Sequence, residues 1–501
     1  MSTNIQILNN AAEAVAWLRT RVQGDLQTDS RKVKPGDAFI AWPGAATDGR
    51  AYVAKALEQG ATAVLVEADG VEAFGLSGDS IAALQGLKPA TGLIADQWFA
   101  HPSNELDVLA VTGTNGKTTT AWWLAHALSK VELNARKGCA LVGTLGVGVP
   151  PALESTGMTT PDPVLLQRVF RSYADQGLAA CAIEASSIGI VEHRLDGTRI
   201  RVALFTNFTQ DHLDYHGSME AYWQAKAQLF DWPGLQAAVV NIDDPHGAKL
   251  WAKLQSRQLD VWSVSIEGPA RLQAKDISMG EQGLSFTVIE AGHSQRMSTR
   301  LVGQYNVSNL LGVLATLRSL GLSLKQAVDA CADLEPVPGR MQQIAKPDMP
   351  LVAVDYAHTP DALEKALRAL QPAAQQRKGK LWCVFGCGGD RDNSKRPIMG
   401  KAAQTYADCV LVTSDNPRSE QPESIIDQIL VGMQPGEALH VEVDRAAAIA
   451  EAIARADARD VVLIAGKGHE DYQETKGVRH PFSDMDEAQK ALAVREGKKR
   501  S

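Results

Sequence analysis

The chain contains only 6 cysteines among its 501 residues, and they are scattered along its length. So few cysteines in a chain of this size exclude a disulfide-rich secreted scaffold and predict reduced thiols in a cytoplasmic protein. Cys383 and Cys387 lie close together, but no second pair follows at the spacing of a zinc site. We therefore expect these two thiols to be buried at a strand end and not to bind a metal.

Long apolar runs and an excess of positive charge are also missing. No stretch of about eighteen uninterrupted apolar residues occurs, so we expect no membrane-spanning helix. Residues 1–20 carry no apolar core behind a basic start, so we also expect no signal peptide. The formal net charge is −8, which argues against nucleic acid or an anionic membrane as the main partner.

The chain is too long for one hydrophobic core, and its 501 residues predict about three domains. Pro102 and Pro336, each with polar or glycine neighbours, mark the two boundaries. Strand-like and helix-like segments alternate in each part, which is typical of α/β proteins. We therefore predict three α/β domains: a small N-terminal one over 1–103, a central parallel-sheet one over 104–335 and a C-terminal Rossmann-like one over 336–501.

The most informative segment is 108–120, in which an apolar strand is followed by a glycine-rich turn and a helix expected over 119–130. Gly113 and Gly116 allow backbone N–H groups to close around phosphate oxygens, and the helix start adds a partial positive charge. Lys117 supplies a full positive charge, and Thr118 supplies the hydroxyl expected on a nucleotide-bound Mg²⁺. This spacing of the glycines is shorter than in the usual P-loop pattern. We predict that the segment binds ATP or GTP, against the alternative of a tight turn with a solvated lysine.

Further residues of the central part are candidates for metal ligands near this loop. Glu184 ends an apolar strand, so its carboxylate is expected at the ligand-binding edge of the sheet. Residues 211–216 follow another strand and contain two histidines that could share one face of a helix. Capping carboxylates and satisfied histidines are the alternative interpretation, and a binuclear hydrolase would need more ligands than the chain groups together. Lys226 lies on the helical stretch 219–230, and taken alone it is expected at the surface.

The last third repeats one pattern, in which an apolar strand ends, a polar or glycine-rich turn follows, and a helix begins. Parallel strands end at one edge of a sheet, where ligands bind, so we expect these turns to face one crevice. The turns are residues 355–360, 386–391, 414–418 and 466–470.

Together these motifs resemble the Mur ligase family, the ATP-dependent amide ligases of peptidoglycan precursor synthesis, over nearly the whole chain. The likeness is greatest to the members that add diaminopimelate, because residues 415–418 and 466–470 resemble their amino-acid recognition motifs. Residues 28–31 resemble their uridine-binding segment. The other matching motifs are residues 112–118, 184–187, 211–214, 303–306 with Asn309, and 339–340.

The resemblance implies that the N-terminal domain binds a UDP-sugar, the central domain binds ATP and the C-terminal domain binds an amino acid. It implies ATP and two Mg²⁺ ions as cofactors, with a carbamate on Lys226 as the anionic oxygen ligand that hard cations prefer. The implied catalytic residues are Lys117, Glu184, His212 and Lys226, and the implied metal ligands are Thr118, Glu184, His212 and Lys226. The implied nucleotide contacts are Gly113, Thr114, Asn115, Gly116, Lys117, Thr118, Thr119, Asn309, Arg340 and Asp355.

The implied reaction joins meso-diaminopimelate to the D-glutamyl γ-carboxylate of UDP-MurNAc-L-Ala-D-Glu through an acyl phosphate, with release of ADP and phosphate. Its product would serve cell wall biogenesis, and through it cell shape and division. Both partners are small molecules, and no coiled coil is evident, so we expect a monomer. The implied contacts to the UDP-linked acceptor are Ser30, Thr159, Thr160, Ser186, Glu192 and Arg194. The implied contacts to the amino acid are Arg391, Asp415, Asn416, Arg418, Gly466 and Glu470.

Arg418 and Glu470 suit the far end of diaminopimelate, which carries a carboxylate and an ammonium. Arg418 can bind the carboxylate in bidentate geometry, and Glu470 can accept hydrogen bonds from the ammonium. Lysine lacks that carboxylate, so a lysine-adding relative is less favoured. A folylpolyglutamate synthase, or a nucleotide-switched binding protein that ligates nothing, would also account for the phosphate loop. The N-terminal domain and residues 28–31 favour a UDP-sugar acceptor over a folate.

Two positions depart from the family pattern. Glu192 stands where members of the family often have Gln, and a further carboxylate beside an anionic substrate is unexpected. Ala45 stands where some members have a His that holds the nucleotide sugar. These departures put the two contacts in question and leave the family resemblance intact.

Overall fold

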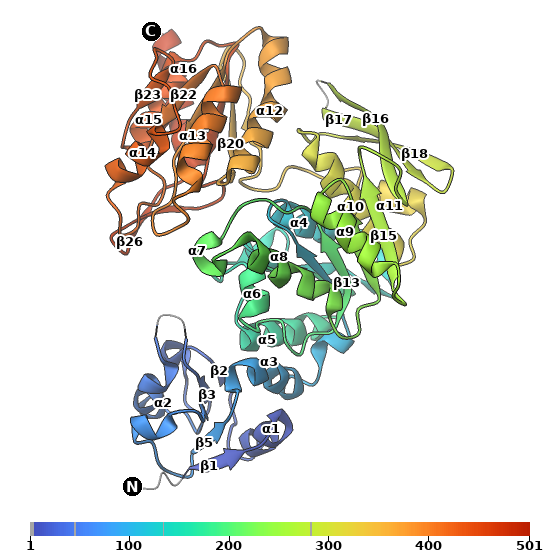
Figure 1. Ribbon diagram of the computed structural model, residues 1–501, viewed down its shortest axis with the longest axis vertical. Coiled ribbons are helices and arrows are strands. Elements are labelled where there is room, and N and C mark those ends of the chain that lie inside the picture. Colours follow the sequence, from blue (N-terminus) through green and yellow to red (C-terminus); the bar gives the residue numbers. More distant parts are fainter. Residues whose placement is uncertain (1–4, 45–46, 134, 281–282, 501) are drawn as a thin grey trace.

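The computed structural model describes residues 5–44, 47–133, 135–280 and 283–500, and within them the strands form three large sheets of five, eleven and six strands. The sheets follow one another along the long axis of the molecule, with the N-terminal and C-terminal parts at opposite ends (Figure 1). Among these residues, no helix is both long and apolar enough to cross a membrane. The α/β class and the three-part organisation predicted from the sequence are confirmed.

The N-terminal sheet is parallel, with its strands in the order β1-β5-β4-β3-β2. Its central strands are short apolar runs buried on both faces, which a parallel sheet covered by helices requires. The elements of this part are β1 (Gln6–Leu8), α1 (Ala11–Arg19), β2 (Leu26–Gln27), β3 (Ala38–Ala41), α2 (Val53–Glu58), β4 (Ala63–Glu67), β5 (Ile81–Leu84) and α3 (Leu87–Trp98).

Helix α3 joins the N-terminal sheet to the central part. The Glu67 carboxylate accepts from two backbone N–H groups at the start of α3, at 2.8 and 3.0 Å, and a negative charge stabilises a helix there. Farther along, Gly92 packs directly on the Asp196 backbone, because a Cβ at Gly92 would collide with the Asp196 carbonyl. A Cβ at Gly197 would likewise lie 2.5 Å from the carbonyl oxygen of Gly92. This contact between two backbones holds α3 against the loop after α6 (Ser187–Val191).

The central sheet has the order β11-β10-β9-β12-β6-β13-β14-β15-β16-β17-β18. Its strands from β9 to β15 are parallel, and both ends of the sheet are antiparallel. Separate apolar clusters cover its two faces, one of which includes α4 and α10. The strands are β6 (Asp107–Thr112), β9 (Cys139–Gly143), β10 (Gly146–Val149), β11 (Ala152–Glu154), β12 (Ala180–Glu184), β13 (Ile200–Phe205), β14 (Ala237–Asn241), β15 (Asp260–Ser265), β16 (Leu272–Gly280), β17 (Gly283–Glu290) and β18 (His293–Thr299).

The helices of the central part pack on this sheet, and a short β-hairpin, β7 (Glu132–Leu133) with β8 (Arg136–Lys137), follows the first of them. Two helices differ from the sequence prediction. Helix α4 begins at Lys117 rather than residue 119, because Gly116 adopts a left-handed conformation and starts the helix. Helix α8 ends at Ala227 and continues as a 3-10 turn. The helices are α4 (Lys117–Ser129), α5 (Pro163–Asp175), α6 (Ser187–Val191), α7 (Leu213–His216), α8 (Met219–Ala227), α9 (Pro245–Leu254), α10 (Tyr305–Ser319) and α11 (Leu324–Ala330).

The C-terminal sheet has the order β19-β20-β24-β21-β22-β23, and every pair except β19-β20 is parallel. The polar turns predicted to share one crevice follow β20, β21, β22 and β24, so they lie at one edge of this sheet as expected. The elements are β19 (Gln342–Ile344), β20 (Leu351–Asp355), α12 (Pro360–Arg377), β21 (Leu381–Phe385), α13 (Lys395–Tyr406), β22 (Cys409–Val412), α14 (Pro422–Leu430), β23 (Leu439–Val441), α15 (Arg445–Arg455), β24 (Val461–Ala465), β25 (Tyr472–Thr475), β26 (Val478–Pro481) and α16 (Asp484–Arg500).

The cysteines and the domain boundaries can be compared with the sequence prediction. Cys383 and Cys387 are buried in and just after β21, as expected, and the other cysteines are also buried free thiols. The boundaries at residues 103 and 335 remain a proposal. Each falls between the last strand of one large sheet and the first strand of the next.

Candidate active site

The turn between β6 and α4 can accommodate only glycine at two positions. Gly113 has φ +143°, and a Cβ there would collide with Thr206 Oγ1. Gly116 has φ +85°, and a Cβ there would lie 2.6 Å from Asn309 Oδ1. Side chains rarely adopt these φ values, and the neighbouring residues leave no room for one. The phosphate loop is therefore packed between the end of β13 and helix α10.

Lys117 is the first residue of α4, and its ammonium group folds back over the loop. Its Nζ donates to the carbonyl oxygens of Gly113, at 3.0 Å, and Thr114, at 2.8 Å. Burial lowers the pKa of Lys117, and the Arg340 guanidinium lowers it further against the opposing charge of Glu184. A lysine held over a loop of backbone N–H groups suits the binding of phosphate oxygens.

Lys226 is only 1% exposed, so the expectation that this residue taken alone lies at the surface is wrong. Its Nζ donates to the same carbonyl oxygen of Gly113, at 2.8 Å, and lies 4.3 Å from the centroid of the Tyr222 ring. Burial holds the pKa of Lys226 well below its ordinary value, and the charge of Lys117 acts in the same direction. The side chain points inward because this face of α8 packs against the phosphate loop.

Glu184 lies at the carboxyl end of β12, as its position after an apolar strand predicted. Its Oε2 accepts from Thr118 Oγ1 at 2.9 Å, and its Oε1 accepts from the Thr144 backbone N–H at 2.8 Å. Arg340 Nη2 also donates to Thr118 Oγ1, at 3.0 Å. Thr144 was not identified from the sequence, although it directly follows β9 and so carries the same strand-end signal as Glu184.

The donors around Thr118 fit a hard cation. Its hydroxyl and the Glu184 carboxylate are adjacent at the phosphate loop, and Mg²⁺ prefers such oxygens. Burial lowers the pKa of His212 to about 3, so its imidazole is neutral at pH 7 and can act as a ligand. Across the residues that the structure describes, no cluster of three or more His, Cys, Asp or Glu side chains could hold a metal. An ion here would therefore need the threonine hydroxyl, phosphate oxygens or a modified Lys226.

A cavity of about 950 Å³ lies between the central and C-terminal parts. Arg340 crosses it, with its guanidinium 4.4 Å from the centroid of the Tyr356 ring. The Nε of Arg340 is buried and has no hydrogen-bond partner among the described residues, so the cavity offers a donor to a ligand. Burial raises the pKa of Asp355, whose Oδ2 accepts from the Met341 backbone N–H at 2.7 Å. Six of the predicted nucleotide contacts line this cavity, namely Asn115, Gly116, Thr119, Asn309, Arg340 and Asp355.

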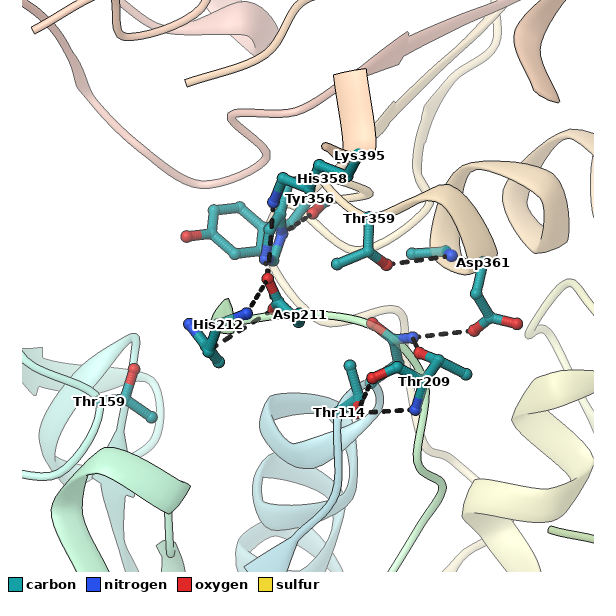
Figure 2. A network of polar contacts seen from close by, with 12 residues as sticks. Thr114, Thr159, Thr209, Asp211, His212, Tyr356, His358, Thr359, Asp361 and Lys395 are labelled. Carbon is teal, nitrogen blue, oxygen red and sulfur yellow. Dashed lines mark hydrogen bonds and ion pairs between the residues drawn. The ribbon is translucent and has the colours of Figure 1, made fainter. Parts of the chain in front are cut away.

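A polar network centred on Asp211 joins the central and C-terminal parts (Figure 2). Asp211 Oδ2 lies 3.4 Å from His212 Nε2 and 3.6 Å from His358 Nε2, and Oδ1 lies 3.5 Å from Lys395 Nζ. Burial alone would raise the pKa of Asp211, but the hydrogen bond from His358 and the charge of Lys395 act against burial, and the pKa lies well below its ordinary value. A side chain next to the predicted metal ligand His212 thus contacts the C-terminal part.

Other contacts cross the same boundary. Asn115 Nδ2 donates to Asp361 Oδ2 at 2.9 Å, and Asp361 is among the residues labelled in Figure 2. Gln210 Nε2 donates to Asp392 Oδ2 at 3.2 Å and to Ser394 Oγ at 3.0 Å. The phosphate loop and the segment before His212 are therefore in direct contact with the C-terminal part.

Three predicted acceptor residues gather beside Glu184. Thr160 Oγ1 donates to the Glu184 carbonyl oxygen at 2.7 Å and lies 2.9 Å from Ser186 Oγ. Arg194 Nη1 donates to the Thr160 carbonyl oxygen at 2.9 Å. The guanidinium of Arg194 is thereby held over the turn that leads from β12 into α6.

Of the remaining predicted acceptor residues, only Thr159 adjoins this group within the described part of the chain. Thr159 Oγ1 is 3.0 Å from Thr144 Oγ1, so it adjoins the Glu184 group. Ser30 is buried in the N-terminal part, and within the described ranges no hydrogen bond links its side chain to that group. Glu192 contacts Lys88 and Tyr215. Ala45 lies outside the described residues, so its predicted effect on the contact with the nucleotide sugar stays a prediction.

The amino-acid motifs meet at the carboxyl edge of the C-terminal sheet. Asn416 Nδ2 donates to Glu470 Oε2 at 2.8 Å, and the buried Lys467 donates to the same oxygen at 2.9 Å. Lys467 also donates to Asn416 Oδ1 at 3.0 Å. Gly466 has φ +122° and packs against the Asp415 carboxylate, which a Cβ would meet. Lys467 was missed in the sequence, although it lies within the predicted turn 466–470.

Arg418 adopts a left-handed conformation, with φ +51°, beside these residues. Its backbone N–H donates to the Glu474 carbonyl oxygen at 3.0 Å, and its Nη1 donates to the Gly389 carbonyl oxygen at 2.6 Å. Arg391 is exposed, but it lies on the other side of the same glycine turn. A Cβ at Gly388 would be 2.9 Å from Arg418 Nη1 and 3.9 Å from Arg391 Cγ. Two arginines thus flank one glycine turn.

Comparison with known proteins agrees with this arrangement. The chain matches the catalytic domain of the Mur ligase family over residues 25–84, the Mur ligase middle domain over 111–317 and the Mur ligase glutamate ligase domain over 339–468. It is 67% identical over 496 residues to UDP-N-acetylmuramoyl-L-alanyl-D-glutamate--2,6-diaminopimelate ligase of Acidovorax sp. (strain JS42), covering 98% of this chain and 99% of that protein.

Solved structures show the same architecture. A structure of a UDP-N-acetylmuramoyl-L-alanyl-D-glutamate--2,6-diaminopimelate ligase is 37% identical, with a TM-score of 0.64, covering 94% of this chain and 95% of the other. A MurF ligase from Thermotoga maritima in complex with ADP is 21% identical, with a TM-score of 0.65, covering 96% and 99%. Because the sequence matches extend from the N-terminal sheet through the phosphate loop to the C-terminal sheet, the chain belongs to the Mur ligase family.

Proposed function

We propose that the chain is an ATP-dependent ligase that adds meso-diaminopimelate to the D-glutamyl γ-carboxylate of UDP-MurNAc-L-Ala-D-Glu, forming a tripeptide precursor of peptidoglycan. The observation that carries this proposal is that Asn416 connects Glu470 and Arg418. Its Nδ2 donates to Glu470, and its Oδ1 accepts from the Glu474 backbone N–H, while the Glu474 carbonyl oxygen accepts from the Arg418 backbone N–H. A guanidinium and a carboxylate at one site match the carboxylate and ammonium at the far end of diaminopimelate. The named activity of a relative that is 67% identical supports it.

The first step activates the acceptor. An oxygen of the γ-carboxylate attacks the γ-phosphorus of ATP, and the bond to the leaving ADP breaks, giving an acyl phosphate. The attack brings two anions together, so Lys117 over the phosphate loop and Arg340 beside Thr118 neutralise the phosphates. When bound, Mg²⁺ ions held by Thr118, Glu184, His212 and carbamylated Lys226 would add further neutralisation of phosphate charge.

In the second step, the amine of diaminopimelate attacks the acyl carbon, and phosphate leaves from the tetrahedral intermediate. This route needs no covalent nucleophile from the protein. Ser186 caps α6, because its Oγ accepts from the Gly189 backbone N–H at 3.0 Å. Ser187 Oγ lies 3.0 Å from His216 Nε2. Neither serine therefore requires a chemical role.

We further propose that the enzyme is a cytoplasmic monomer that closes during the reaction. The predicted nucleotide contacts come from both the phosphate loop and Asp355, while the acceptor residues lie in the first two parts and the amino-acid residues in the last. Closure would bring these groups together and keep water away from the acyl phosphate.

We expect the radius of gyration to decrease when a non-hydrolysable ATP analogue and the acceptor are both present, measured by small-angle X-ray scattering. Asp211 and Asn115 already contact the C-terminal part, so the two parts are in contact before any closure. A Lys117→Met variant with the same ligands is the control, because it should bind the analogue weakly. Identical scattering of the wild type with and without both ligands would contradict closure.

The activity itself is tested by phosphate release from ATP and Mg²⁺ with UDP-MurNAc-L-Ala-D-Glu, with meso-diaminopimelate or L-lysine in separate reactions. We expect release with diaminopimelate and the tripeptide nucleotide as product. Release with lysine alone would keep the ligase and overturn the role given to Arg418. Turnover with neither amino acid would refute the proposal and direct the search to folate acceptors. Binding of ATP without acceptor-dependent ADP release would indicate a nucleotide-switched binding protein.

A further inference from the structure

Side chains from three elements meet at Glu192, one of the two positions that depart from the family pattern. Lys88, on the first turn of α3, places its Nζ 2.7 Å from Glu192 Oε2. Tyr215, on α7, donates its hydroxyl to Glu192 Oε1 at 2.5 Å. Glu192 itself directly follows α6. One carboxylate therefore joins the N-terminal part, through Lys88, to two short helices of the central part.

The charges of this group balance each other. The side chains of Lys88 and Glu192 are only 28% and 20% exposed. Burial alone would raise the pKa of Glu192, but the hydrogen bonds from Lys88 and Tyr215 outweigh it and the pKa is lowered. Burial and the nearby Glu192 raise the pKa of Tyr215 to about 12, so its hydroxyl stays a donor at neutral pH. The carboxylate is thus ionised and compensated by Lys88.

On one side, the group is anchored near the acceptor residues. Helix α3, which carries Lys88, is fixed by the backbone contact of Gly92 with Asp196. In the sequence, Arg194 lies between Glu192 and Asp196, and its Nη1 donates to the Thr160 carbonyl oxygen at 2.9 Å. A shift of α3 relative to α6 would therefore displace the Arg194 guanidinium, one of the implied contacts to the UDP-linked acceptor.

On the other side, the group holds the helix that begins after His212. His212 has φ +53° at the start of α7, and α7 is only one turn long. Two side-chain contacts tie α7 to α6: Tyr215 to Glu192, and His216 Nε2 to Ser187 Oγ at 3.0 Å. The position of His212 therefore depends on contacts outside its own helix.

We propose that Lys88, Glu192 and Tyr215 form a positioning bridge that couples the N-terminal part to Arg194 and His212 and keeps the Glu192 carboxylate from repelling the diphosphate of the acceptor. This inference rests on the proposed function, because the acceptor is the UDP-linked peptide. Glu192 acts through its neighbours, so the direct substrate contact implied by the family pattern is replaced by an indirect role. Lys88 is the residue that allows a glutamate at this position.

The test compares Lys88→Met, Glu192→Gln and the double variant in steady-state kinetics. Lys88→Met leaves an uncompensated carboxylate beside the acceptor, and we expect its KM for UDP-MurNAc-L-Ala-D-Glu to rise about tenfold. The double variant removes both charges, but the amide at position 192 can still accept from the Tyr215 hydroxyl, so α7 stays held and the repulsion is gone. Its KM should therefore return to within about threefold of the wild type, as should that of Glu192→Gln. The KM for ATP should change less than about twofold in all three. A loss of packing alone would not be rescued by the second substitution.

Lys325→Met is the matched control, because Lys325 forms an exposed ion pair with Asp329 on α11, and it should leave both KM values unchanged. Hydrogen–deuterium exchange of residues 212–217 in the ligand-free protein is the second readout, and Lys88→Met should accelerate it several-fold. The bridge would be refuted if Lys88→Met changed neither the exchange of residues 212–217 nor the KM for the acceptor. It would also be refuted by either unchanged value alone, or by an acceptor KM as high in the double variant as in Lys88→Met. If the wild type ligates no acceptor but Lys88→Met still accelerates the exchange of residues 212–217, the proposed function is refuted and the bridge is retained.

Discussion

Lys226→Ala is expected to lower kcat about a thousandfold in the ligation assay, because it removes the proposed anionic ligand beside the phosphate loop. The wild-type side chain is buried, and its Nζ is 2.8 Å from the Gly113 carbonyl oxygen. Burial holds the pKa of Lys226 well below its ordinary value, which favours the neutral amine over the ammonium group. An uncharged amine can attack CO₂, whereas an ammonium group cannot.

The loss could come from removing the positive charge and hydrogen bonds of Lys226 or from removing its carbamate, and Lys226→Arg distinguishes these two explanations. Arginine keeps a positive charge and hydrogen-bond donors but does not form this carbamate, so we expect it to be as inactive as the alanine variant. Dialysis of the wild type against CO₂-free, Mg²⁺-free buffer should lower its initial rate, and bicarbonate should restore it. Circular dichroism checks that each variant is folded. Full activity of Lys226→Arg, or a wild-type rate indifferent to bicarbonate, would refute the carbamate.

The residue Lys226 also shows where single-residue inference from sequence fails. Its helix carries no clear apolar face around this position, so nothing local distinguishes a buried lysine from a solvated one. Glu184, in contrast, was located from the apolar strand before it, because parallel strands deliver their last side chains to the ligand-binding edge. Thr144 follows β9 in the same way, and the same rule would have found it.

Contacts between the large sheets could not be predicted from spacing. The bonds of Asp211 to His358 and Lys395, and of Lys88 to Glu192, join residues far apart in the chain. These contacts depend on how the N-terminal, central and C-terminal parts are oriented relative to one another. The apolar periodicity of a single helix or strand carries no information about that orientation. The α/β class was predictable because alternating strands and helices imply parallel pairing. The antiparallel extension β16–β18 was not, because the apolar–polar alternation of β17 indicates a half-buried strand but does not say which sheet that strand joins.

Arg418→Ala is expected to lower kcat/KM for meso-diaminopimelate about a thousandfold while leaving the KM for ATP unchanged. Only one donor of Arg418 is committed to the Gly389 carbonyl oxygen in the described structure, and a guanidinium has five. The others can bind the distal carboxylate of diaminopimelate in a fork. ATP binding should be spared because the nucleotide cavity is lined by residues such as Asn309 and Asp355 and not by Arg418.

Selectivity is the sharper measurement of the two. In the wild type, L-lysine brings an ammonium but no carboxylate, so it leaves Arg418 unpaired beside a cation, and that costs several kcal/mol, roughly a thousandfold. In Arg418→Ala that penalty disappears, and the ratio of kcat/KM for diaminopimelate to that for lysine should approach one. Arg459→Ala, which removes an exposed arginine paired with Asp457, should leave the ratio at its wild-type value. If Arg418→Ala still prefers diaminopimelate as strongly as the wild type, the discriminating group is not Arg418, and the exposed Arg391 on the other side of the glycine turn becomes the residue to replace.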